Sequence, residues 1–139
     1  MQHIELPYAV VEYRAPIIQI IFKDKVEIGY FEIKELTAAC EELSKSDPYY
    51  VLSDVRARVN VTPQGRRLAT DKHAAPLNKA TAVLVDSAMM KIAANFFGKI
   101  VRPGYPYKAF TNKQQALSWL KNVHEHHLSR EVQQAGKRA

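Results

Sequence analysis

Residues 17–22 read Ile17-Ile18-Gln19-Ile20-Ile21-Phe22 and are apolar on both faces of an extended chain. A short run of this kind is typical of a strand at the centre of a sheet, where both faces are covered. Residues 8–14 precede it, and their aromatic and β-branched side chains predict another strand. Only Ala15-Pro16 separates the two runs, so we expect them to form an antiparallel hairpin.

Helical and extended patterns alternate in the rest of the chain. Ile33, Leu36, Cys40 and Leu43 recur at helical spacing, and Asp47-Pro48 ends that helix. Further strands are predicted at residues 49–53, 79–85 and 107–110, and further helices at about 63–74, 88–101 and from 113 onward. Because strands that alternate with helices favour parallel pairing, the expected fold class is α/β. We expect a mixed five-stranded sheet with about four helices, in the order ββαβαβαβα.

Length and charge limit the classes of function. The 139 residues predict one domain at residues 1–125, followed by a polar C-terminal tail at 126–139. Residues 1–50 hold five Lys/Arg and nine Asp/Glu, whereas residues 51–139 hold fifteen Lys/Arg and five Asp/Glu. This uneven charge suits acidic partners, anionic lipid headgroups, nucleic acid or head-to-tail self-association. The one cysteine, Cys40, excludes an internal disulfide. No signal peptide or bilayer-length apolar run is visible, so we expect a cytoplasmic protein.

Several stretches carry a resemblance to a known family. They are Val51-Leu52-Ser53-Asp54, the Thr62-led helix with Arg66, the apolar strand at 80–85, and the text at 92–97 and 110–120. Together they resemble the STAS-like fold of bacterial anti-sigma-factor antagonists, and most closely the small, uncharacterised bacterial proteins labelled STAS/SEC14-like. The resemblance spans about residues 8–123. It implies a STAS-like fold and a regulatory role.

The antagonist family keeps a phosphorylatable serine at the start of the helix after the third strand. Thr62 is the residue of this chain that matches that position, but Pro63 follows directly and the acidic neighbour and the Ser-Gly pair are missing. A threonine followed by proline is a typical helix start, so Thr62 is interpreted as an N-cap. Phosphorylation of Thr62 is kept as the alternative.

A candidate anion site follows the strand at 49–53. Ligands of open α/β sheets bind beyond the carboxyl ends of the strands, which is where Asp54 lies. Free N–H groups at the Thr62-led helix and nearby guanidinium groups favour an anion or nucleotide there. The candidate residues are Asp54, Arg56, Arg58, Thr62 and Arg66. The alternative is that Asp54 pairs with one arginine and the others are solvated.

The helix at 88–101 carries two apolar stripes, although a surface helix needs only one. One stripe holds Met89, Ile92, Ala93, Phe96 and Ile100, and the other holds Met90, Ala94, Phe97 and Val101. One stripe can face the sheet, and the other is expected to meet a partner subunit, an apolar ligand, a membrane surface or a neighbouring helix of the same chain. The candidate interface or apolar-ligand residues are Met89, Met90, Phe96, Phe97 and Val101.

Other chemistries find little support in the sequence. There is no Gly-x-Ser-x-Gly elbow, and Cys40 lies on an apolar stripe, which is typical of a core residue. His124, His126 and His127 are interpreted as solvated helix-end residues rather than metal ligands, because zinc needs three or four converging groups. Tyr105, Tyr107 and Phe110 lie near basic residues, but no nucleic-acid-binding motif is present.

We therefore expect a non-catalytic, STAS-like regulatory or protein–protein interaction module without a cofactor. Its expected partner is a second copy of itself, as a homodimer, or an unidentified protein. The first alternative, which the SEC14-like label suggests, is a carrier or sensor of a small apolar or amphipathic ligand such as a lipid. The others are the anion or nucleotide module described above and a hydrolase that uses Asp54.

Overall fold

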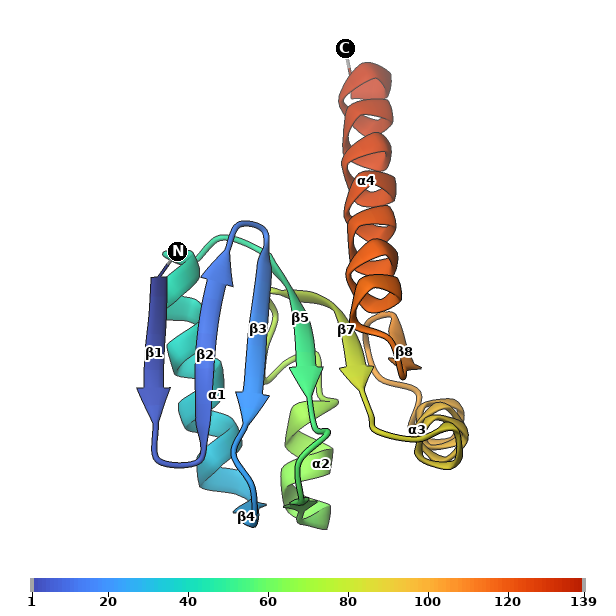
Figure 1. The fold of residues 1–139 in the computed structure, drawn as a ribbon. Coiled ribbons are helices and arrows are strands. Elements are labelled where there is room, and N and C mark those ends of the chain that lie inside the picture. Colours follow the sequence, from blue (N-terminus) through green and yellow to red (C-terminus); the bar gives the residue numbers. More distant parts are fainter. Residues whose placement is uncertain (1, 139) are drawn as a thin grey trace.

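The computed structural model describes residues 2–138 and contains eight strands and four helices within them (Figure 1). The strands are β1 (Gln2–Leu6), β2 (Ala9–Arg14), β3 (Ile17–Phe22), β4 (Val26–Ile28), β5 (Tyr49–Asp54), β6 (Val59–Val61), β7 (Asn78–Leu84) and β8 (Tyr107–Phe110). The helices are α1 (Tyr30–Ser44), α2 (Pro63–Ala69), α3 (Ala88–Val101) and α4 (Lys113–Arg138).

Six of the strands form one mixed sheet in the order β1-β2-β3-β5-β7-β8. β1, β2 and β3 pair antiparallel, and Val10 of β2 lies opposite Ile21 of β3, as expected for the predicted hairpin. The pairs β3·β5, β5·β7 and β7·β8 are parallel. The predicted α/β class is confirmed, and so is the central position of β3 between β2 and β5.

The sheet has one strand more than the five that the sequence predicted. β1 is the additional strand, and it lies at the edge of the sheet, where it pairs only with β2. Its residues are mostly polar and exposed, so no apolar pattern marks it as a strand. Edge strands are often short and carry charged side chains, which prevent their free edge from pairing with another chain. Outside this sheet, β4 and β6 form a small parallel pair.

Two apolar layers cover opposite faces of the sheet. Alternate side chains of a strand point to opposite faces, so Tyr49 and Val51 of β5 join the layer under α1 while Tyr50 and Leu52 join the layer under α4. Figure 1 shows α1 and α2 behind the sheet and α4 on its other side. α1 lies over β1 and β2, whereas α4 lies over β5, β7 and β8.

α4 is longer than the sequence predicted. It continues to Arg138 and extends well beyond the sheet, as Figure 1 shows. The predicted boundary at residue 125 therefore falls inside a helix, and residues 126–138 of the predicted tail are helical. No proline or glycine interrupts the chain between Lys113 and Gly136, so nothing in this stretch breaks the helix. α2, by contrast, ends at Ala69 and not at about residue 74.

Candidate functional site

A cavity of about 740 Å³ lies between one face of the sheet and the helices α1, α2 and α3. Its walls are mostly apolar, and it is partly open to solvent. From the sheet it is lined by Ile20, Phe22, Val51, Ser53, Thr81 and Val83, from α1 by Ile33, Leu36, Thr37 and Cys40, and from α3 by Met90, Ala93, Ala94 and Phe97.

The position of α3 leaves this cavity unfilled. α3 packs mainly against β8, at the edge of the sheet, and does not cover β5 or β7. Asn95 accepts a hydrogen bond from the backbone N–H of Ala109 at 2.9 Å. Gly98 lies against the ring of Tyr107, so closely that a Cβ at this position would lie 2.7 Å from Tyr107 Cδ1. These two contacts hold α3 beside β8, and none of its residues is buried.

Hydrogen bonds satisfy several polar groups of the cavity wall. The hydroxyl of Tyr105 donates to the carbonyl of Ala69 at 2.6 Å, and the amide of Asn78 donates to Thr81 Oγ1 at 3.0 Å. Burial raises the pKa of Tyr105 and that of the Cys40 thiol to about 12. Both groups are therefore neutral at physiological pH, which keeps this part of the wall uncharged.

Three charged residues line the cavity, and their surroundings differ. Arg58 is held by Asp24, with 2.6 Å between Arg58 Nη2 and Asp24 Oδ2. Arg66 lies 5.7 Å from the centroid of the Phe97 ring, at cation–π distance, and has no carboxylate partner within residues 2–138. Asp86 is exposed, just before α3. Arg66 is thus the cation of the wall that is available to a polar or anionic group of a ligand.

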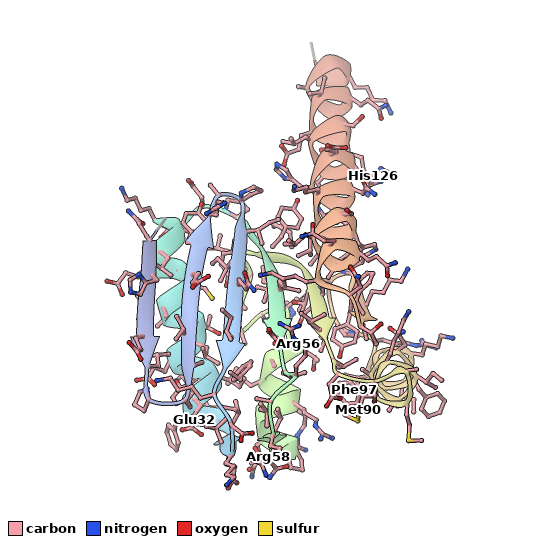
Figure 2. All side chains as sticks on the ribbon, in the orientation of Figure 1. Glu32, Arg56, Arg58, Met90, Phe97 and His126 are labelled. Atoms are coloured by element: carbon pink, nitrogen blue, oxygen red, sulfur yellow. The ribbon has the colours of Figure 1, made fainter. Side chains whose placement is uncertain are left out.

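Of the five residues of the predicted anion site, Arg58 and Arg66 line the cavity, whereas Asp54, Arg56 and Thr62 do not. Asp54 is buried and is bound by Arg56, whose Nε and Nη2 donate to its two carboxylate oxygens at 3.0 and 2.8 Å. This hydrogen-bonded guanidinium lowers the pKa of Asp54, although burial of the carboxyl opposes the shift. The interpretation that Asp54 pairs with one arginine therefore matches the geometry. Figure 2 shows Arg56 and Arg58 at separate places along the chain that follows β5.

Thr62 is the N-cap of α2, as the sequence predicted. Its Oγ1 accepts a hydrogen bond from the backbone N–H of Gly65 at 3.1 Å, and Pro63 occupies the first helical position. α2 has only seven residues, so few aligned peptide dipoles support an anion at its start. Phosphorylation of Thr62 stays a prediction.

The two apolar stripes of α3 face different surroundings. Met90 and Phe97 lie on the side of α3 toward α2, as Figure 2 shows, and both line the cavity. Met89 and Phe96 are exposed, and Val101 is also exposed at the C-terminal end of the helix. α3 is therefore not enclosed by its own chain, and a partner for these residues stays a prediction.

The interpretation of the α4 histidines as solvated helix-end residues is wrong for His124 and His127, which pack against Tyr50 within the helix, whereas His126 is exposed. Tyr50 and His127 are joined by a hydrogen bond of 2.8 Å between the phenol oxygen and Nδ1, and His124 packs edge-on against the same ring. Within residues 2–138, no three His, Cys, Asp or Glu side chains are grouped to hold a metal ion. None of the helices described in this range is long and apolar enough to cross a bilayer.

Sequence reasoning missed most of the cavity. The sequence places Tyr105 and Tyr107 near basic residues and predicts strands at Tyr107, Ser53, Thr81 and Val83, but it assigns none of them to a cavity. One signal was available, because Ser53 of β5 and Thr81 of β7 place hydroxyl groups on the same face of the sheet as Val51 and Val83. A helix packed directly on this face would normally meet larger apolar residues.

The comparisons with known proteins support the fold and assign no activity. The family model described as "Domain of unknown function (DUF7793)" matches residues 11–124. One similar solved structure is that of an uncharacterised protein of the DUF3478 family from Shewanella loihica PV-4, which is described as having a SpoIIAA-like fold. The two structures superpose with a TM-score of 0.53 and 15% sequence identity, over 81% of this chain and 91% of that one. No curated protein matches. The STAS-like fold is thereby confirmed, whereas the SEC14 part of the resemblance finds no support.

Proposed function

We propose a function from the geometry of this chain, which belongs to the family described as domain of unknown function DUF7793. It is a non-catalytic module that binds a small, largely apolar ligand in the cavity between the sheet, α1, α2 and α3. The observation that carries the proposal is the cavity of about 740 Å³ with mostly apolar walls. This volume lies within the range of roughly 300–1,000 Å³ that is usual for small-molecule sites.

The walls favour an apolar ligand over water. Protein interiors are close-packed, and apolar surface left in contact with water costs about 25 cal/mol for each Å². Phe97 and Val83 are only partly buried in the free chain, and both line the cavity. A ligand that fills the cavity removes this surface from water, which provides the free energy of binding.

Arg66 gives the site a preference for an amphipathic ligand. The face of Phe97 and the guanidinium group of Arg66 lie together at the wall, so an apolar body and a polar end can be bound side by side. A carboxylate or phosphate group would form charge-assisted hydrogen bonds with the guanidinium group. The ligand class is therefore an apolar molecule with one anionic or strongly polar group.

A binding role fits the chemistry of the wall better than catalysis. The thiol of Cys40, whose pKa burial raises to about 12, is neutral and weakly nucleophilic at physiological pH. Asp54, the residue of the hydrolase alternative, does not line the cavity, and Arg56 occupies its carboxylate. The lining residues described above form no pair of nucleophile and base.

Titration with 1-anilinonaphthalene-8-sulfonate, an apolar dye with one anionic group, tests the proposal. We expect the dye to fluoresce with the native protein and to bind the Ala94→Trp variant at least about tenfold more weakly, because the new ring fills the cavity. Ala88→Trp is the matched control, since Ala88 lies on the same helix, is exposed and does not line the cavity. Equal dye binding by both variants would show that the cavity is not the site.

Competition with decanoate and decanol tests the role of Arg66. Decanoate is expected to displace the dye more effectively than decanol, and Arg66→Ala is expected to reduce this preference by about tenfold. Arg67→Ala is the control, because Arg67 is the adjacent arginine, is exposed and does not line the cavity. An unchanged preference in Arg66→Ala would remove the guanidinium group from the site.

The regulatory role and the cytoplasmic location expected from the sequence remain part of this proposal. A module that senses a ligand acts through a change of partner, and the exposed apolar residues of α3 offer a surface for one. The predicted homodimer is tested by light scattering at high micromolar concentration. A monomeric mass across the concentration range would exclude it.

A further inference from the structure

The outer stripe of α3 is a second apolar surface, distinct from the cavity wall. Met89, Ile92, Phe96 and Ile100 have exposed fractions of 80%, 71%, 63% and 65%. Their spacing places them along one side of the helix. Met90 and Phe97, which line the cavity, are displaced by about a quarter turn or more from this side. We call these four exposed residues the outer stripe.

The chain that forms the outer stripe and continues beyond it is cationic. Between Ser87 and His124 the chain holds six Lys/Arg residues and no Asp or Glu. Lys99 follows Phe96 by three positions and Ile92 by seven, so it borders the outer stripe. Arg102 is the C-cap of the same helix, and both Lys99 and Arg102 are exposed. Any surface that covers the outer stripe therefore meets positive charge.

This charge distribution decides which occupant fits. A second copy of α3 packed on the first would bring the two sets of cations together, and α3 has no carboxylate to pair with them. The outer stripe offers no neutral polar side chain for hydrogen bonds to a protein partner. Figure 1 shows α3 at a corner of the molecule beyond β8, while α4 extends in another direction. A flat surface can therefore approach α3 more readily than a partner that needs a groove.

We infer that α3 docks on the surface of an anionic lipid bilayer. The four apolar side chains of the outer stripe enter the boundary between headgroups and acyl chains, and Lys99 and Arg102 lie among the anionic headgroups. A helix with apolar residues on one side and lysines beside them is the kind that lies in the plane of a membrane interface. The inference goes beyond ligand binding in the cavity and does not depend on it.

Vesicle flotation tests the inference with the full chain. We expect the protein to float with vesicles of phosphatidylcholine and phosphatidylglycerol and to stay behind with vesicles of phosphatidylcholine alone. Phe96→Glu is expected to reduce the bound fraction by about tenfold, and Lys99→Glu by about fivefold, because each basic residue near an anionic surface contributes on the order of 1 kcal/mol. High salt is expected to weaken binding of the wild-type chain.

Two control variants make the same changes elsewhere. Val132→Glu introduces a carboxylate at an exposed apolar residue of α4, where the exposed fraction is 72%, and Lys137→Glu reverses a charge near the end of that helix. Both are expected to float like the wild-type chain. Equal losses in these controls would overturn the inference, because binding would then follow net charge and not the outer stripe.

Two further outcomes would also overturn it. One is that the wild-type chain fails to float with the anionic vesicles. The other is a dimer, detected by light scattering, that Phe96→Glu converts to a monomer, since a second copy would then cover the outer stripe. The Ala94→Trp variant separates this inference from the proposed function: flotation is expected to persist in it, whereas dye binding is lost.

Discussion

Asn95 of α3 accepts a hydrogen bond from the backbone N–H of Ala109 in β8, with 2.9 Å between the amide oxygen and the nitrogen. β8 is an edge strand, and its outward N–H groups have no neighbouring strand to bind them. Asn95 supplies the acceptor from a helix that is otherwise rich in apolar residues. This bond fixes α3 at the edge of the sheet, and the cavity exists because α3 lies there.

Replacement of Asn95 tests how firmly α3 is held. Asn95→Ala removes the acceptor and leaves the N–H of Ala109 without its partner, so we expect the free energy of unfolding to fall by about 1–3 kcal/mol. Urea denaturation monitored by circular dichroism measures the change. Asn122→Ala is the control, because Asn122 is an exposed residue of α4, and its replacement is expected to change stability by less than about 0.5 kcal/mol. Similar values for the two variants would show that the Asn95 bond contributes nothing.

Gly65 marks a close approach between α2 and the start of α1. A Cβ at this buried position would lie 2.8 Å from the carbonyl oxygen of Ile28, a backbone atom that cannot turn aside. We therefore expect Gly65→Ala to lower the free energy of unfolding by about 1–3 kcal/mol, although alanine is the better helix former. Thermal unfolding followed by circular dichroism measures the loss.

Gly136→Ala is the matched control for this prediction. Gly136 lies in α4, and a Cβ there would meet no atom within 4 Å. With no clash to offset the helix propensity of alanine, we expect stability to stay constant or to rise by up to about 1 kcal/mol. A stabilising effect of Gly65→Ala would contradict the close contact with Ile28.

The pair Tyr50 and His127 makes stability depend on pH. Burial lowers the pKa of His127 below its ordinary value of 6.5, and nearby His126, Arg130 and Lys79 act in the same direction, while Glu131 opposes them. The unfolded chain therefore binds a proton at a higher pH than the folded chain does. Stability is expected to be highest when His127 is neutral and to fall as the pH drops below about 6.5.

Urea denaturation at about pH 7.5 and about pH 5.5 measures this effect. The wild-type chain is expected to lose more stability between the two values than His127→Gln does, because the variant has no ring to protonate at this position. His73→Gln is the control, since His73 is exposed and is not among the groups that act on His127, and it is expected to behave like the wild-type chain. A loss of the same size in His127→Gln would assign the pH dependence to other groups.

Local patterns predicted most of the fold. The hairpin of β2 and β3 and the helical spacing of Ile33, Leu36, Cys40 and Leu43 depend on neighbours in the sequence, and the structure confirms both. β1 could not be recognised, because its identity as a strand depends on pairing with β2 and not on its own polar residues. Local propensity describes such segments poorly, since tertiary pairing decides their state.

The candidate site was less predictable because it depends on contacts between distant residues. The cavity follows from where α3 lies, and the contact of Gly98 with Tyr107 cannot be derived from either residue alone. The predicted anion site joined residues that are close in sequence, but Arg58 binds Asp24, which is 34 positions away. The exposure of α3 was easier to anticipate, because two apolar stripes on one surface helix exceed what one sheet can cover.

Cys40 offers a test of the packing of α1 that needs no change to the protein. It is the chain's one cysteine and lies on the buried face of α1, and burial raises the pKa of its thiol to about 12. Because the thiolate is the reactive form, we expect Cys40 to react with Ellman's reagent at least about a hundredfold more slowly in the native protein than in urea.

A chain with Cys40→Ala and Ser129→Cys carries its thiol at an exposed residue of α4 instead and is expected to react rapidly without denaturant. If native Cys40 is labelled as rapidly as the thiol of this control chain, α1 opens readily. If decanoate slows the labelling of native Cys40, the cavity that Cys40 lines is the place where decanoate binds.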